Sequence, residues 1–376
     1  MTEAFAAGGA DVVVWTTEQP FLLRDFKDYP DHDRISLHID PYFSTPPQGS
    51  FDAVILAPDQ AVDWSPYVAA VSIARSQGAP FVLLDFEAPK WFNAENAGRR
   101  SIFRTASVWF SARYADVILS STAYGSEHAR EYYKPQKPAN AFRYCYPSVN
   151  SIVADRVTAD RADQIICIAR ITPASQHKGV TSLLDVFTDD LARYSFVIIG
   201  TMPKENEDRL RRAAEAHGIN FVVKWGLTDH EKFEEIKRSR LMVFLSTFEG
   251  FGYPPVEALY CGVPCIVNPL PVLREVSGDA PIYLKDASDN LSEVVKEALD
   301  RTEPLVSPAD RDRIWSRVNF DSYVERLAKL LSDLESPEFT PVAARTRGGI
   351  DFGIFVLVGR ITRWLYRCVR RSESST

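Results

Sequence analysis

Cysteine is scarce in this sequence, and the few cysteines exclude a disulfide framework. The 376 residues include five cysteines, an odd number without regular spacing, which favours a reducing compartment over a disulfide-stapled extracellular fold. No cysteine and histidine cluster has the spacing of a zinc site. Cys261 and Cys265 flank a Gly-Val-Pro turn and are predicted to be small buried residues, not metal ligands.

The sequence also has no segment that resembles an export signal or a membrane span. Its start, Met1-Thr-Glu-Ala-Phe, is acidic and lacks a basic region ahead of an apolar stretch. We therefore expect a cytoplasmic protein whose first residues lead into a core strand. The apolar run 350–358 is too short and too interrupted to cross a bilayer.

The chain as a whole has a negative net charge, but its C-terminal end is basic. The formal net charge of −7 argues against general nucleic-acid binding. From Arg345 onward, however, seven arginines stand against Asp351 and Glu373, a net charge of +5 that leaves −12 for the rest. This asymmetry indicates that the tail meets an anionic surface.

Within the tail, apolar and basic residues recur at helical spacing. The apolar set is Leu357, Ile361, Trp364, Leu365 and Cys368, and the basic set is Arg360, Arg363, Arg367, Arg370 and Arg371. After a linker over 337–349, we expect a basic amphipathic helix over 350–371 that lies on an anionic membrane surface, with Trp364 at the headgroup level. The alternative is a helix that docks on the protein body or on a partner.

The main body alternates strands and helices twice, which predicts an α/β protein with two Rossmann-like, doubly wound parallel sheets. With 45% hydrophobic and 25% charged residues, the composition is ordinary for a globular protein of this length. The expected strands of the first half are 12–15, 35–39, 53–56, 81–84 and 117–120, with helices over 65–77, 98–115 and 125–133. The second half has expected strands at 165–169, 196–199, 221–225 and 241–245, with helices over 180–187, 205–217, 230–239 and 320–334.

The most informative segment follows the apolar run 241–245, which reads as a strand buried in a parallel sheet. Ligands bind at the carboxyl end of such strands. Gly250 and Gly252 allow the backbone to approach a ligand closely, while Pro254 and Pro255 suit the start of a helix. The pattern predicts a strand, a glycine-rich turn and a helix N-terminus, which favours phosphate.

Two glutamates frame this turn. Glu249 precedes it, and Glu257 is expected in the first turn of the helix. An ionised carboxylate only accepts hydrogen bonds, so it can bridge the vicinal hydroxyls of a sugar or a ribose through charge-assisted bonds of roughly 1.5–3 kcal/mol each. The segment therefore predicts a site for a sugar joined to a diphosphate.

Two cations upstream suit the same chemistry. Arg170 follows the expected strand 165–169, and Lys178 precedes the helical pattern 180–187, with His177 beside it as a neighbour of the site. Breaking the bond between the anomeric carbon and phosphate leaves negative charge on the departing diphosphate, and fixed cations stabilise that charge as it develops. Arg170 would clamp oxygens in a planar fork, and Lys178 would act as a point charge.

The segments 246–268, 273–276 and 278–280 resemble the nucleotide-sugar site of the family 4 glycosyltransferases, which have the GT-B fold and retain configuration at the anomeric carbon. Arg170 and Lys178 resemble the diphosphate signature of this family. The resemblance implies that Glu249 contacts donor-sugar hydroxyls near the reacting carbon, that Glu257 contacts the ribose, and that the two cations bind the diphosphate. Further donor-binding residues would be Gly200, Gly250, Phe251, Gly252 and Tyr253.

The resemblance also predicts the domain organisation. An acceptor-side domain would span 1–150, a nucleotide-sugar-binding domain 151–319, and a crossover helix 320–336 would return towards the first domain. The active site is expected in the cleft between the domains. No metal is expected, because Asp31-His-Asp33, the Asp-x-Asp of this chain, has no apolar strand before it.

The first half departs from the family pattern in two places. Gly8-Gly9 precedes the first expected strand, whereas many members carry a Gly-Gly loop after it. Where many members place a histidine after a strand, this chain has Asp85-Phe-Glu-Ala-Pro-Lys-Trp91. Glu87 and Lys90 are candidates to face the reacting centre, and the alternative for each is an ordinary surface charge.

The sequence thus predicts transfer of a sugar from a nucleoside-diphosphate sugar to a hydroxyl acceptor, such as a glycan or lipid-linked glycan of surface polysaccharide or glycolipid assembly, at the cytoplasmic face of a membrane. No cofactor is expected beyond the co-substrate. The alternatives are a related sugar phosphorylase or nucleotide-sugar epimerase, and a catalytically silent homologue that acts as a membrane-associated scaffold or sugar-nucleotide-binding subunit. The base, the sugar, the acceptor and the linkage stay open.

Overall fold

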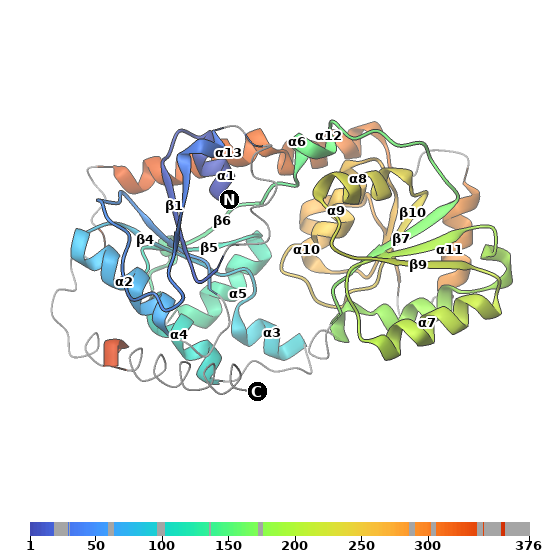
Figure 1. Cartoon of the computed structure of the whole chain (residues 1–376), viewed down its shortest axis with the longest axis horizontal. Coiled ribbons are helices and arrows are strands. Elements are labelled where there is room, and N and C mark those ends of the chain that lie inside the picture. The colour runs from blue at the N-terminus through green and yellow to red at the C-terminus, as the bar shows by residue number, and fades with distance from the viewer. Residues whose placement is uncertain are drawn as a thin grey trace. The chain divides into compact units, whose positions relative to one another are not determined.

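The computed structural model describes residues 1–18, 29, 31–58, 64–95, 102–134, 137–171, 176–285, 290–301, 306–336, 341 and 355–357, and structural statements concern these residues. They form two compact units (Figure 1). The first unit contains nearly all of residues 1–145 together with those from 323 onward, and the second contains 146–322. The predicted domain boundaries were 150 and 319.

The second unit is built on a six-stranded parallel sheet. Its strands are β7 (Gln164–Ile168), β8 (Ser195–Ile199), β9 (Asn220–Lys224), β10 (Leu241–Phe244), β11 (Cys265–Val267) and β12 (Ile282–Tyr283). They lie in the order β12-β11-β10-β7-β8-β9, and every neighbouring pair is parallel. The order reverses between β7 and β10, so these two strands flank the topological switch point, where doubly wound sheets bind ligands.

Helical segments follow most of these strands. The α-helices are α6 (Ser151–Ala154), α7 (Lys204–Ala216), α8 (Asp229–Arg238), α9 (Tyr253–Tyr260), α10 (Pro271–Ser277), α11 (Leu291–Asp300) and α12 (Pro308–Val318), and the 3-10 segments are η4 (Gln176–Lys178), η5 (Val180–Val186) and η6 (Asp189–Leu191). The predicted α-helix over 180–187 is wrong in type, because η5 is a 3-10 helix. Its buried residues are Val180, Leu183 and Val186, a spacing of three that matches the three residues per turn of a 3-10 helix.

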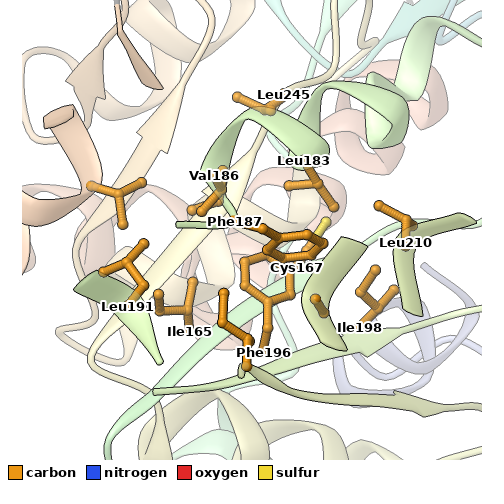
Figure 2. Close-up of a cluster of buried hydrophobic side chains, with 14 of the residues drawn as sticks. Ile165, Cys167, Leu183, Val186, Phe187, Leu191, Phe196, Ile198, Leu210 and Leu245 are labelled. Carbon is orange, nitrogen blue, oxygen red and sulfur yellow. The ribbon is translucent and has the colours of Figure 1, made fainter. Parts of the chain in front are cut away.

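A hydrophobic core joins η5 and α7 to one face of this sheet (Figure 2). Phe196 on β8 lies edge-on to Phe187, with ring centroids 5.2 Å apart. Ile198 and Leu183 are fully buried in the same cluster. The core fixes the backbone of η5, which begins directly after the residues that the sequence assigns to diphosphate binding.

The first unit holds two hydrogen-bonded sets of strands, where the sequence predicted a single sheet. Its strands are β1 (Val12–Thr16), β2 (Ile35–Ile39), β3 (Val54–Leu56), β4 (Phe81–Leu84), β5 (Val117–Ser120) and β6 (Phe142–Tyr144). The last four form a parallel sheet in chain order, and β1 pairs in parallel with β2 alone among the described residues. Both sets are parallel, as the α/β prediction requires.

The helices of the first unit differ from the prediction in two places. They are α1 (Thr2–Ala7), α2 (Ser65–Gln77), α3 (Pro89–Glu95), α4 (Ile102–Ala112), α5 (Ala123–Tyr133) and α13 (Phe320–Glu335), with 3-10 turns η2 (His32–Arg34) and η3 (Ala139–Ala141). The first residues form α1 before β1, and Ala4, Phe5 and Ala6 bury its apolar face. The helix predicted over 98–115 ends earlier, at Ala112, and a separate helix, α3, precedes it.

α13 begins in the second unit and belongs to the first from Tyr323 onward. Its Leu327, Leu330 and Leu334 are buried, and Arg143 on β6 donates to Asp333 at 2.6 Å. α13 therefore packs into the first unit through an apolar stripe that recurs every three to four residues.

A short piece of the C-terminal segment is also part of the first unit's core. Phe355 is 1% exposed, and its ring centroid lies 5.9 Å from that of Trp64, 6.3 Å from Phe110 and 6.1 Å from Tyr114. Leu357, two residues on, is 56% exposed. The rest of the predicted amphipathic helix 350–371 lies outside the described residues. None of the helices that the structure describes has the length and hydropathy of a membrane span.

Candidate functional site

The residues that the sequence assigned to the donor gather at the carboxyl end of the second unit's sheet. Arg170 stands two positions after β7, and Glu249 lies in the loop between β10 and α9. Because β7 and β10 are neighbours across the switch point, their loops leave the sheet side by side. The topology therefore brings together two loops that are about seventy residues apart in the chain.

Lys178 and Glu249 form a direct ion pair. Lys178 Nζ lies 2.6 Å from Glu249 Oε1, and the two side chains are 24% and 10% exposed. A charge-assisted hydrogen bond this short is among the stronger kinds that proteins make. The sequence predicted both residues for one site, and the structure places them in contact.

Glycine at 179 allows this approach. Gly179 has φ +64, and a Cβ there would lie 2.1 Å from the carbonyl oxygen of Leu245 at the end of β10. The backbone N–H of Thr247 donates to the carbonyl of His177 at 2.8 Å, and the ring of His177 lies edge-on to that of Phe248 at 6.0 Å. The segment that carries Lys178 thus lies directly against the loop that leads to Glu249.

Asn268 supports the same loop from the next strand. Its Nδ2 donates to the carbonyls of Leu245 at 2.9 Å and Ser246 at 3.2 Å. The hydroxyl of Ser246 in turn donates to the carbonyl of Phe248 at 2.9 Å. The sequence analysis assigned no role to Asn268 or Ser246, although the position of Asn268 directly after a strand of the same sheet is a signal that could have indicated one.

The glycine-rich turn is buried except at its last residue. Gly250, Phe251 and Gly252 are buried, whereas Tyr253 is 43% exposed with its ring 4.9 Å from that of Phe251. Gly252 has φ +85 and precedes α9, and a Cβ there would come within 2.5 Å of Leu273 Cδ2 on α10. Glycine is required here by backbone conformation and by close packing, and the roles of these four residues in donor binding stay predictions.

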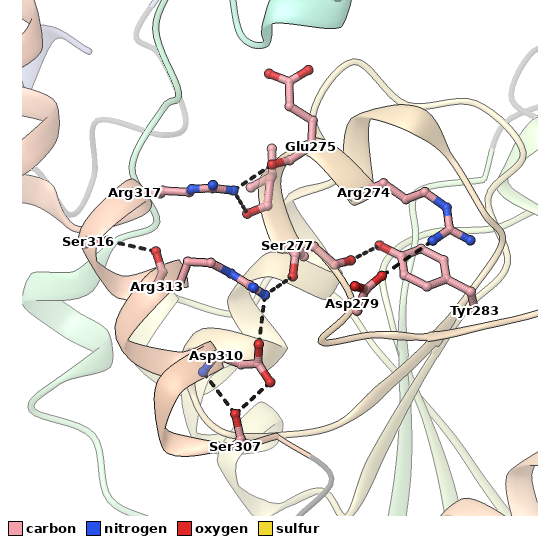
Figure 3. Close-up of polar contacts among 12 residues, drawn as sticks. Arg274, Glu275, Ser277, Asp279, Tyr283, Ser307, Asp310, Arg313, Ser316 and Arg317 are labelled. Atoms are coloured by element: carbon pink, nitrogen blue, oxygen red, sulfur yellow. Dashed lines mark hydrogen bonds and ion pairs between the residues drawn. The ribbon is translucent and has the colours of Figure 1, made fainter.

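α10, which supplies Leu273, is held by two arginines of α12 (Figure 3). Arg313 Nη2 donates to the carbonyl of Ser277 at 2.7 Å, and Arg317 Nη1 donates to that of Glu275 at 2.7 Å. These carbonyls belong to the last turn of α10, where the helix leaves them without internal partners and where its dipole favours cations. The turn at Gly252 is therefore supported through α10 by α12.

Glu257 lies one turn further along α9 than predicted. Because α9 begins at Tyr253, ahead of both prolines, Glu257 is its fifth residue. The glutamate is 6% exposed, and its Oε1 accepts a hydrogen bond of 2.7 Å from Lys232 Nζ on α8. Lys232 also pairs with Asp229 at 2.9 Å.

These contacts shift the ionisation of the group. Burial raises the pKa of Glu257, and Lys232 offsets part of that increase. Burial acts to lower the pKa of Lys232, but Glu257 and Asp229 together outweigh it and raise the pKa. The sequence analysis missed Lys232 and Asp229, because nothing in a polar helix of this length marks which of its lysines points inward.

Gly200 packs against the residue that precedes Arg170. It has φ +142, and a Cβ there would lie 2.0 Å from the carbonyl oxygen of Ala169. The N–H of Ile171 donates to the carbonyl of Thr201 at 2.7 Å, so the backbone is held on both sides of the arginine. The Arg170 side chain is exposed. The structure explains the glycine by packing, and its direct donor role stays a prediction.

The candidates from the first half lie in the other unit. Glu87 is half-buried just after β4, and its role at the reacting centre stays a prediction. Lys90 forms an ion pair with Glu131 on α5, with both side chains largely exposed, which is the arrangement of a surface charge.

Cys261 follows α9, and Cys265 lies on β11. Cys265 is fully buried, as predicted, whereas Cys261 is only half-buried. Burial raises the pKa of the Cys261 thiol to about 12. The described residues hold no group of three or more His, Cys, Asp or Glu side chains that could bind a metal ion.

The described residues define an α/β protein with parallel sheets, an ion pair at the switch point of the second unit and a glycine-rich turn before α9. Residues 151–315 match the family model described as Glycosyl transferases group 1. The match covers less than half of the chain, and it falls on the segment that the sequence motifs likened to a glycosyltransferase.

Curated relatives match parts of the chain. The serotype-specific mannosyltransferase WbdA of Escherichia coli is 30% identical over 141 residues, which is 36% of this chain and 17% of the relative. The GDP-mannose:cellobiosyl-diphosphopolyprenol alpha-mannosyltransferase of Xanthomonas oryzae is 28% identical over 160 residues, 40% of each chain. The O-antigen chain mannosyltransferase RfbU of Salmonella typhimurium is 28% identical over 110 residues, 28% of this chain and 30% of the relative. The chain thus spans less than half the length of these relatives.

Solved structures share the fold over more of the chain. Anabaena Alr3699/HepE in complex with UDP and glucose has a TM-score of 0.65 at 14% identity and covers 88% of this chain and 94% of that one. Sucrose-phosphate synthase from Thermosynechococcus elongatus has a TM-score of 0.56 at 15% identity and covers 72% of each chain. At this identity the likeness concerns the fold, and it confirms the predicted GT-B class.

Proposed function

We propose that this protein transfers a sugar from a nucleoside-diphosphate sugar to a hydroxyl acceptor, with retention of configuration at the anomeric carbon. The observation that carries the proposal is the Lys178–Glu249 pair of 2.6 Å at the switch point. The pair combines a cation for the departing diphosphate with a carboxylate for sugar hydroxyls. The close packing of Gly179 against Leu245 holds the two loops together.

The roles of the site residues follow from their charge and position. Lys178 and Arg170 would stabilise the negative charge that develops on the diphosphate, because each is a permanent cation at the switch point. Glu249 would accept hydrogen bonds from hydroxyls of the donor sugar. Glu257, on the helix that starts after the glycine-rich turn, would accept from the ribose.

The donor to test first is GDP-mannose. Three relatives that match part of the chain are named as mannosyltransferases, and the Xanthomonas oryzae enzyme is named for GDP-mannose. UDP-glucose is the natural comparison, because a fold neighbour is described in complex with it. The names of these relatives also support a glycan acceptor in polysaccharide assembly, including one carried on a lipid diphosphate.

The C-terminal segment would bring the protein to that acceptor at the cytoplasmic face of a membrane. The five arginines after residue 357 alternate with apolar residues, which suits an anionic lipid surface. Phe355 is buried in the first unit, so the basic segment is tied to that unit by an anchor in its core.

Truncation after Leu357 should abolish co-sedimentation with anionic vesicles while leaving nucleotide binding and thermal stability unchanged. This cut removes the five arginines after residue 357 and keeps Phe355. A cut before Arg345 also removes Phe355 and should lower the free energy of unfolding by about 3–5 kcal/mol, the cost of deleting a buried phenylalanine side chain. The measurement is sedimentation with phosphatidylglycerol vesicles beside thermal unfolding.

Full-length Phe355→Ala is the matched control for the truncations. It should be destabilised like the longer truncation and should still sediment with vesicles. Unchanged sedimentation of the chain that ends at Leu357 would contradict the membrane role of the tail.

The decisive test of the catalytic proposal is donor-dependent glycosylation. The protein should release free nucleoside diphosphate only as an acceptor gains a sugar. Phosphorolysis or isomerisation of the donor sugar would instead indicate the related phosphorylase or epimerase reactions.

A further inference from the structure

Glu257 is connected to a network of polar side chains that has no role in the function proposed above. Asn150 Nδ2 donates to Asp229 Oδ2 at 2.7 Å, and Lys232 Nζ lies 2.9 Å from Asp229 Oδ1. The same ammonium group donates to Glu257 Oε1 at 2.7 Å. The four residues come from α8, α9 and the residue that caps α6, so the network joins three elements of the second unit.

Lys232 is the centre of this network. Its side chain is 20% exposed, and its Nζ lies 4.6 Å from the ring centroid of the fully buried Phe233. An ammonium group removed from water is costly unless it is paired. Here two carboxylates pair with it and raise its pKa, although burial acts in the opposite direction. Lys232 is therefore a cation at neutral pH.

Glu257 has few other partners. Among the described residues, the hydrogen bond to its carboxylate comes from Lys232 and reaches Oε1. The other charge that acts on Glu257 is Asp229, which repels it, and the Cys261 thiol at the end of α9 stays protonated. Lys232 is thus the cation that compensates the buried carboxylate.

We propose that Lys232 is a positioning residue of the nucleotide site, which holds the Glu257 carboxylate through Oε1 so that Oε2 accepts a ribose hydroxyl. Asp229 and Asn150 hold Lys232 in turn. The inference rests on the proposed function, because it assumes that Glu257 binds the ribose. It assigns to Lys232 the task of keeping this carboxylate charged and oriented. Lys232 does not itself touch the nucleotide.

The consequence is a change in the pH dependence of nucleotide affinity. In Lys232→Gln the buried Glu257 loses its counter-ion, so its pKa rises further and the carboxylate is protonated nearer to neutral pH. Affinity for GDP or UDP should fall on the order of tenfold at pH 6.5, the scale of one hydrogen bond to a charged group, and should recover as the pH is raised to 8.5. Lys232→Arg keeps the charge and should keep the wild-type profile.

A double substitution separates positioning from direct contact. In a Glu257→Gln background, Lys232→Gln should cause no further loss of GDP or UDP affinity, because its effect passes through the carboxylate. Arg238→Gln, an exposed change on the same helix, is the control for general effects on α8. Lys232→Met, which also removes the charge but keeps a side chain of similar length, should shift the pH profile in the same direction if Lys232→Gln does not fold.

Isothermal titration calorimetry with GDP and UDP from pH 6 to 9 tests the inference. Binding by the wild type that weakens in Glu257→Gln supports the nucleotide site, and no binding by the wild type would overturn the proposed function itself. If the wild type binds through Glu257, while Lys232→Gln keeps the affinity and pH profile of the wild type, the positioning role is wrong. A further loss in the double variant would also overturn it, because Lys232 would then contact the nucleotide directly.

Discussion

Replacing Lys178 by alanine should lower turnover by on the order of 10²–10³, the scale for removing one group that stabilises developing charge. Lys178 is the cation that the structure places 2.6 Å from Glu249. The diphosphate gains negative charge as its bond to the sugar breaks, so the loss should appear mainly in kcat and less in KM. Arg170→Ala should give a loss of similar size, because the two cations share one task.

Lys204→Ala is the control for this experiment. Lys204 lies on α7 of the same unit, is 77% exposed and pairs with Asp208, so its removal should leave turnover unchanged. Thermal unfolding of each variant checks that a loss of rate is not a loss of fold, since Lys178→Ala removes the cation of a half-buried ion pair. Near-wild-type rates in both Lys178→Ala and Arg170→Ala would contradict the assignment of the diphosphate site.

Gly179→Ala should destabilise the second unit and impair catalysis together. A side chain at φ +64 costs roughly 1–2 kcal/mol by itself, and its Cβ would lie 2.1 Å from the carbonyl oxygen of Leu245. Since this oxygen belongs to the backbone, the loop must move away from β10. We expect a loss of about 2–4 kcal/mol in the free energy of unfolding, together with a fall in turnover as Lys178 leaves Glu249.

Gly226→Ala is a matched control within the same unit. Gly226 has φ +69, close to that of Gly179, but a Cβ there would meet nothing within 4 Å. It should therefore show only the conformational cost and keep its turnover. Hydrogen exchange in peptides of β7 and β10, measured in mild denaturant, reports the stability of the sheet at the site. Equal effects of the two substitutions would show that the contact with Leu245 does not hold the site together.

The buried strands β4 and β5 could be predicted from the sequence, because parallel strands that are covered on both faces form continuous apolar runs. The runs at β4 and β5 were predicted with their observed bounds. The strands β6 and β12 were missed, since β6 has an arginine between two aromatic residues and β12 has two residues. The 3-10 form of η5 was also missed. Every third residue of η5 is buried, and this spacing is set by how the segment packs on the sheet.

The candidate site was predictable as a set of residue types but not as a set of contacts. Lys178 and Glu249 were recognised by their motifs. Their ion pair, however, depends on the close packing of Gly179 against Leu245, which the sequence does not reveal. Lys232 was not recognised at all. The role proposed for Lys232 depends on the packing of α8 beside α9, which brings Lys232 to Glu257. These residues are 25 positions apart, and no sequence pattern links them.

The measurement that tests the central claim most directly is the release of GDP from GDP-mannose, with UDP-glucose in parallel, in the presence of lipid-linked and free glycan acceptors. The account predicts that nucleoside diphosphate and a product one sugar larger form in equal amounts with one of these donors, and that both disappear in Lys178→Ala. Tight nucleotide binding with no product from either donor, under conditions where the protein is folded and bound to vesicles, would contradict it and would favour a sugar-nucleotide-binding scaffold.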